Sequence, residues 1–174
     1  MTIPELFLQE FDEEMPSTRK ILERVPEHSF SWKPHEKSMT LGRLASHVAD
    51  LPARCATIIT TEELVRPVGF TPWTASTTAE LLDHFDAVTG DARTALAGLR
   101  DDQLSVLWSI KMGDRVLASV PRAMALRRIF MDHHIHHRAQ LGVFLRLECR
   151  HAVIGRYLFV VQPLTQACLG RLSF

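Results

Sequence analysis

Four of the nine histidines fall within five consecutive positions, in the sequence Phe130-Met131-Asp132-His133-His134-Ile135-His136-His137-Arg138-Ala139-Gln140. His133 and His137 are four residues apart, which is about one turn of a helix, so both imidazoles leave the same helical face. Two imidazoles on one face can bind a single metal ion. The spacing therefore predicts a helix that carries part of a metal site, and it says much less about a reaction.

The positions of these histidines on the helix predict different roles for them. On a projection of about 100° per residue, the positions within about 60° of His133 are Leu126, Ile129, Phe130, His137, Gln140 and Phe144. His133 and His137 thus share an apolar stripe that should face the core. His136 lies at the edge of this stripe, where it could support the ligands or line the rim. His134 lies about a quarter turn away, beside Leu141 and Leu145, and we expect it to serve packing or to contact solvent.

Two imidazoles are too few for a firm site, and His47 is the best candidate for a third ligand. It lies in the sequence Leu41-Gly42-Arg43-Leu44-Ala45-Ser46-His47-Val48-Ala49-Asp50-Leu51, on a helical stripe with Leu44, Leu51, Cys55 and Ile58. Three inward imidazoles from two helices would form a His₃ site with positions left for water or substrate. A hydrogen-bonded core histidine is the alternative for His47, and histidine clusters also occur on solvated helical faces.

Other polar side chains near these histidines allow two interpretations each. Cys55, two turns from His47, is either a thiol near the metal or, as is commoner, a buried structural cysteine. Asp50 and Asp132 could orient a ligand imidazole or could be solvated charges. The three tryptophans in predicted loops either line a pocket mouth or cover the end of the fold: Trp32, Trp73 and Trp108. The remaining histidines are assigned no function: His28, His35, His84 and His151.

Helical periodicity dominates the chain and predicts an all-α fold. We expect helices over 4–25, 38–63, 77–99 and 121–147, with Thr40 and Thr77 or Thr78 as N-caps. Pro16 should interrupt and kink the first helix, and Pro52 should bend the second. The stretch 107–120 predicts a short hairpin or an extended loop, and the apolar tail over 152–169 predicts an additional helix. The simplest architecture is a single domain over 1–174, a four-helix bundle with an appended C-terminal helix.

Composition excludes several classes of protein. Hydrophobic residues make up 46% of the 174 residues and charged residues 23%, as in ordinary globular proteins. Lys plus Arg equals Asp plus Glu at 20 each, so no net charge recruits nucleic acid or an anionic membrane. The three cysteines form no C-x-x-C pair, which favours free thiols and a cytoplasmic location: Cys55, Cys149 and Cys168. We expect no signal peptide, and the most apolar stretch, 157–161, is too short to span a bilayer.

Three segments together resemble the DinB-like (DinB/YfiT) superfamily of bacterial four-helix-bundle proteins. Trp32-Lys33-Pro34 with Ser38-Met39-Thr40-Leu41-Gly42 is similar to the family's approach to its second helix, and Leu44-Ala45-Ser46-His47 to its first ligand segment. His133-His134-Ile135-His136-His137-Arg138-Ala139-Gln140-Leu141, with Leu145-Arg146, resembles the family's H-x-x-x-H-R-G-Q motif. Ala139 stands where the family usually has glycine, a small-for-small change.

The resemblance implies a divalent metal, zinc or nickel, held by His47, His133 and His137, and it implies a homodimer. Characterised members include thiol transferases that use bacillithiol or mycothiol and a mycothiol-dependent maleylpyruvate isomerase, and many others have no known activity. The leading hypothesis is a metal-dependent enzyme that transfers a low-molecular-weight thiol to a small electrophile. The alternatives are a hydrolase that uses metal-bound water and a non-catalytic, stress-associated metal-binding protein. The two enzymatic hypotheses require a small-molecule substrate, whereas the non-catalytic one requires the metal alone. No catalytic residue beyond the ligands is identified.

Overall fold

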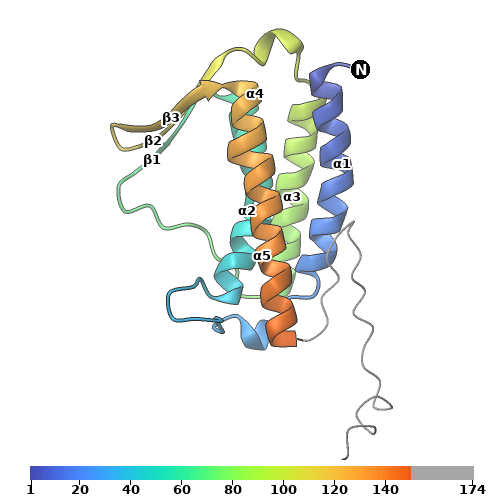
Figure 1. Ribbon diagram of the computed structural model, residues 1–174, viewed down its shortest axis with the longest axis vertical. Coiled ribbons are helices and arrows are strands. Elements are labelled where there is room, and N and C mark those ends of the chain that lie inside the picture. The colour runs from blue at the N-terminus through green and yellow to red at the C-terminus, as the bar shows by residue number, and fades with distance from the viewer. Residues whose placement is uncertain (150–174) are drawn as a thin grey trace, which may run out of the picture.

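The computed structural model describes residues 1–149, and its centre is a bundle of four long helices. These are α1 (Ile3–Leu22), α2 (Leu41–Thr60), α3 (Thr78–Ala97) and α5 (Asp132–Cys149), which lie side by side (Figure 1). The short helix α4 (Arg122–Met124) and the π-helical segment η3 (Ala125–Met131) lead directly into α5. The expected four-helix bundle is confirmed. The expected helix over 152–169, with His151 and Cys168, lies outside the described residues.

Threonine caps fix the beginnings of three of the helices. Thr2 and Glu5 form a capping box at the start of α1. The Thr40 hydroxyl accepts a hydrogen bond from the Arg43 backbone N–H at 3.2 Å, and Thr77 caps α3 in the same way. Both caps were predicted. Pro16 and Pro52 lie inside α1 and α2, and neither proline ends its helix, so the predicted interruption at Pro16 is wrong. Two single 3₁₀ turns, η1 (Glu27–Ser29) and η2 (Asp101–Gln103), lie in the connections.

A small three-stranded sheet lies beside one end of the bundle (Figure 1), of which the all-α prediction included only a possible hairpin over 107–120. Strand β1 (Glu63–Arg66) pairs in parallel with β2 (Leu107–Met112), and β2 pairs antiparallel with β3 (Arg115–Pro121). The two-residue turn of this hairpin contains Gly113 at φ 56°, in the left-handed region that favours glycine. The hairpin reading of 107–120 is therefore confirmed. β1 has only four residues, too few for its alternation to stand out in the sequence.

Two buried side chains join the sheet to the bundle. Trp108, expected in a loop, lies on β2 and is fully buried, and its indole N–H donates to the Thr61 hydroxyl at 3.3 Å. The buried Arg122 guanidinium donates to the carbonyl oxygens of Ile58, at 2.8 Å, and of Thr61, at 3.1 Å, both at the C-terminal end of α2. Because these bonds fix the start of the last helical segment against α2, they set where the histidines of α5 lie. Within the described residues, no helix is long and apolar enough to cross a membrane.

Candidate metal centre

The three histidines proposed as ligands come together between two neighbouring helices. His47 projects from the middle of α2, and His133 and His137 project from the first two turns of α5. The Nε2 atoms of His47 and His133 lie 2.9 Å apart. The ring centroids of His133 and His137 lie 4.5 Å apart, and those of His47 and His137 lie 4.6 Å apart. One nitrogen from each ring lies within 4.8 Å of the other two, close enough for the three to hold one metal ion.

Gln140 orients the ring of His137. Its Oε1 lies 2.6 Å from His137 Nδ1, one helical turn along α5. Because an amide oxygen only accepts hydrogen bonds, Nδ1 carries the proton and Nε2 keeps its lone pair. A hydrogen bond from the outer nitrogen to an oxygen is the usual way in which proteins fix the tautomer and direction of a metal-binding imidazole. The arrangement of Gln140 and His137 therefore suits a ligand role for Nε2.

The electrostatics of the cluster keep these imidazoles neutral at physiological pH. Burial, with a smaller contribution from His137 and Arg54, lowers the pKa of His47 to about 3. Burial and then Arg54 lower the pKa of His133 to about 4, and burial lowers that of His137 as well. A metal binds the lone pair of a neutral imidazole, so protons compete weakly for these nitrogens near pH 7.

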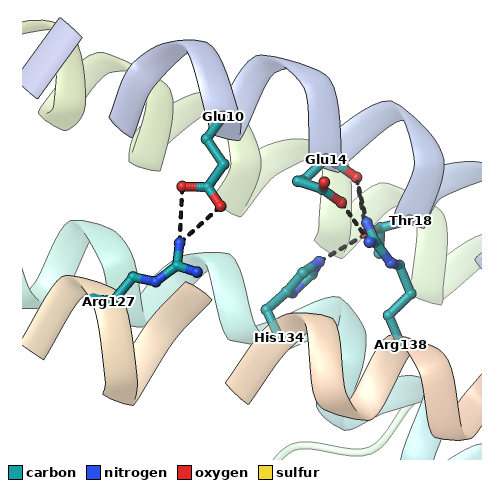
Figure 2. Close-up of polar contacts among 6 residues, drawn as sticks. All are labelled: Glu10, Glu14, Thr18, Arg127, His134 and Arg138. Atoms are coloured by element: carbon teal, nitrogen blue, oxygen red, sulfur yellow. Dashed lines mark hydrogen bonds and ion pairs between the residues drawn. The ribbon is translucent and has the colours of Figure 1, made fainter. Parts of the chain in front are cut away.

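His134 faces a different neighbour from His133 and His137. It is fully buried against α1, where its Nε2 lies 2.7 Å from the Thr18 hydroxyl (Figure 2). Arg138 adds to this contact by donating to the Glu14 carbonyl oxygen at 3.0 Å and by pairing with the Glu14 carboxylate. His134 is thus a packing residue, one of the two roles expected of it.

His133 and His137, expected on an apolar stripe that faces the core, are less deeply buried than His134, which was expected off that stripe. The most buried positions of η3 and α5 run through Phe130, His134, Leu141 and Leu145, whereas His133 and His137 are half-buried beside α2. The reason is that this segment packs against both α1 and α2 and so has two inward faces. Periodicity alone did not distinguish them, and η3, being π-helical, also departs from the 100° per residue that the projection assumed. His136 is exposed beside His137, as expected of a residue at the rim.

None of the other polar candidates contacts the three histidines. Asp50 Oδ1 lies 3.0 Å from His84 Nε2, and Asp132 pairs with Arg127 at 3.0 Å, so neither carboxylate orients a ligand ring. Cys55 is fully buried, and burial raises the pKa of its thiol well above the usual range. Cys55 is therefore a structural cysteine, the commoner of the two roles considered for it.

A hollow opens directly beside His47. Its other lining residues are Arg43, Asp50, Arg54, Arg66, Phe70, Pro72 and Trp73, and its volume is about 50 Å³. A larger hollow of about 200 Å³ shares four of these residues, namely Asp50, Arg54, Arg66 and Phe70, so the two hollows adjoin each other. Trp73 lines the smaller hollow and stacks on His84 with ring centroids 4.0 Å apart, whereas Trp32 packs edge-on against Phe144.

Three arginines line this hollow that were not predicted as site residues from the sequence, namely Arg43, Arg54 and Arg66. Arg43 and Arg54 are four residues before and seven residues after His47, which places all three on one face of α2. That spacing could have revealed them. Arg66 lies on β1, and nothing in the sequence indicated that this strand reaches the hollow.

Comparisons with known proteins agree with this architecture. A search of curated proteins finds no match. A crystal structure of a DinB-like protein from Bacillus subtilis aligns with a TM-score of 0.65 and 22% identity, over 88% of this chain and 97% of that one. A DinB-like protein from Bacillus cereus aligns with a TM-score of 0.63 and 22% identity, over 82% of this chain and 91% of that one. At this identity the two alignments show a common fold. The sequence model of the DinB family matches residues 1–157, and the chain therefore belongs to the DinB family.

Proposed function

We propose that this protein is a metal-dependent enzyme that transfers a low-molecular-weight thiol to a small electrophile, with a divalent zinc or nickel ion held by His47, His133 and His137. The observation that carries the proposal is the convergence of three neutral imidazoles, one nitrogen of each lying within 4.8 Å of the others. When bound, a divalent ion at this position would lower the pKa of a thiol and so favour its nucleophilic thiolate form at neutral pH.

The chain's own residues supply the surroundings that such a transfer needs. Gln140 holds His137 with Nε2 unprotonated, and the hydrogen-bonded start of the last helical segment fixes α5 against α2. The hollow beside His47, together with the larger one that adjoins it, provides space for a small molecule near the histidines. The guanidinium groups that line it favour the anionic form of a bound thiol, because opposite charge stabilises the ionised state.

Within the part of the chain whose side chains the structure describes, no cysteine is suited to supply a nucleophilic sulfur. Among the described side chains the one cysteine is Cys55, which is buried and whose thiol pKa is raised by that burial. A thiol in that state remains protonated and is not a nucleophile. A separate, low-molecular-weight thiol is therefore the expected co-substrate.

The test is thiol consumption in the presence of monochlorobimane as the electrophile. Protein loaded with zinc or nickel is assayed with bacillithiol, mycothiol, glutathione and cysteine, and the same assay is run after treatment with a chelator. We expect acceleration with one of these thiols, its loss after chelation, and its loss in His133→Ala but not in the rim variant His136→Ala. No acceleration with any of the four thiols would reject thiol transfer. Ester or amide hydrolysis without added thiol would point to hydrolysis instead.

A further inference from the structure

Three arginine side chains surround the hollow beside the metal-ligating histidines. Arg43 and Arg54 come from the same face of α2 as His47, and Arg66 comes from β1. All three side chains are partly buried. Because like charges repel and half-buried charges lose hydration, this arrangement costs stability unless something else stabilises it.

None of these arginines pairs with a carboxylate in the part of the chain that the structure describes. Arg43 Nη1 is buried and has no hydrogen-bond partner there. The hydrogen bond of the Arg54 side chain goes to the Ile129 carbonyl oxygen at a long 3.4 Å, and Arg66 lies 4.9 Å from the centroid of the Phe70 ring. Other arginines of the bundle behave differently, since each of the following forms an ion pair with Asp or Glu: Arg19, Arg93, Arg127 and Arg138.

The hollow therefore has a net positive charge. Asp50 is the one carboxylate that lines it, and its Oδ1 is already bonded to His84. Three guanidinium groups thus face one carboxylate, and the neighbouring His47 is neutral. Burial, followed by the charge of Arg66, lowers the pKa of Arg54 to about 10, and the opposing effect of the Asp50 carboxylate is smaller than either.

We infer that Arg43, Arg54 and Arg66 bind the carboxylate of a small organic anion, whose apolar part lies against the wall of the hollow. A guanidinium group matches a carboxylate with two parallel N–H donors, and Arg43, which lines the hollow, has a buried Nη1 with no protein acceptor. Phe70, Leu64 and Pro67 provide an apolar wall next to these charges. An apolar wall with a few convergent polar groups is typical of a small-molecule site.

The size of the hollow limits the ligand to a small molecule. A water molecule in the liquid occupies about 30 Å³, so the larger hollow of about 200 Å³ has room for a molecule of roughly the size of benzoate. Because Arg54 and Arg66 line both this hollow and the smaller one beside His47, such an anion would lie near the proposed metal ligands. We take this anion to be the electrophilic substrate, and that assignment rests on the proposed thiol transfer. The binding of the anion does not depend on it.

The test is calorimetric titration of the metal-free protein in low-chloride buffer with three probes, namely benzoate, its neutral isostere benzamide, and inorganic phosphate. We expect benzoate to bind at least about tenfold more tightly than benzamide, because the charge-assisted hydrogen bonds depend on the carboxylate. Arg43→Gln and Arg54→Gln should each weaken benzoate binding by about tenfold or more. Arg24→Gln, at an exposed position just beyond α1, is the matched control and should not change it.

A second measurement separates a binding role from a structural one. Without benzoate, Arg43→Gln should melt at or above the temperature of the wild-type protein, because it removes a half-buried and unpaired charge. Benzoate should raise the melting temperature of the wild-type protein and not that of the variant. A variant that melts well below the wild-type protein would show that Arg43 supports the fold.

Three results would overturn the inference. These are equal affinity for benzoate and benzamide, unchanged benzoate affinity in both arginine variants, and tighter binding of phosphate than of benzoate, which would indicate a phosphate site. The titration uses no metal and no thiol, so its outcome is independent of the transferase assay. Failure of thiol transfer with intact benzoate binding would leave the anion site in place and remove only the proposed reaction.

Discussion

Replacement of Gln140 by leucine tests whether this amide prepares His137 to bind a metal. The structure gives His137 Nδ1 one close acceptor, Gln140 Oε1 at 2.6 Å, in a half-buried position. Leucine has a similar size but no acceptor, so the Nδ1 proton loses its partner and the ring loses its fixed tautomer. Loss of such an outer hydrogen bond typically weakens metal binding by about 10- to 100-fold, which corresponds to about 1.4–2.7 kcal/mol.

The assay is competition for zinc between the protein and a chromophoric chelator at pH 7.5. Gln140→Leu should show the weaker affinity, whereas Gln140→Glu should bind zinc as tightly as the wild-type protein or more tightly, because a carboxylate is a stronger acceptor for the Nδ1 proton. Circular dichroism provides the control for folding of both variants. Wild-type affinity in a folded Gln140→Leu variant would refute the idea that Gln140 orients His137 for the metal.

Three further predictions concern the packing around this centre. Thr18→Val removes the hydroxyl that bonds the fully buried His134, so thermal denaturation should show a loss of about 1–3 kcal/mol, and an unchanged melting temperature would contradict that role. In Gly42→Ala the new Cβ would lie 2.9 Å from ring atoms of Phe30, so urea denaturation should show a loss of about 1–3 kcal/mol. Gly90→Ala, on a helix with nothing within 4 Å of its Cβ position, should instead gain up to about 1 kcal/mol, and similar effects of the two substitutions would be inconsistent with this packing. Burial holds the pKa of His134 at about 3, below its unfolded value of 6.5, so the unfolded chain binds the extra proton. In the metal-free protein, the contribution of neutral His134 to the free energy of unfolding is complete above about pH 6.5 and falls by about 1.4 kcal/mol per pH unit as the pH drops toward 3. A free energy of unfolding that does not change between pH 7 and pH 5 would contradict this.

Local signals in the sequence were sufficient to predict where the helices lie and that His47, His133 and His137 come together. The caps at Thr40 and Thr77 are set by residues three positions apart, and the hairpin turn at Gly113 by its own two residues, so neighbours alone predicted them. The pairing of His133 with His137 is likewise a property of one helical turn. His47 was chosen as the third ligand because it lies on the inward face of a second helix. The resemblance to the DinB family, which the family match confirms, supported the same choice.

Features that depend on long-range packing were not predictable in this way. β1 pairs with β2 more than forty residues later along the chain, and its four residues carry no periodicity of their own. The burial of Trp108 follows from that sheet. The depth of His134 relative to His133 depends on which neighbouring helix each one faces, and amphipathic patterns do not distinguish two apolar neighbours. The arginine cluster depends on both kinds of feature. The spacing of Arg43 and Arg54 along α2 can be recognised in the sequence, whereas the position of Arg66 beside them depends on how β1 packs.

The metal content of protein purified without nickel resin tests the central claim most directly. Inductively coupled plasma mass spectrometry should find one zinc or nickel ion per wild-type chain after loading and desalting. His133→Ala should lose most of this metal, because it removes one of three imidazoles that lie within 4.8 Å of one another, whereas His136→Ala at the exposed rim should retain it. Equal metal content in the two variants, or no metal in the wild-type protein, would contradict a site built from His47, His133 and His137.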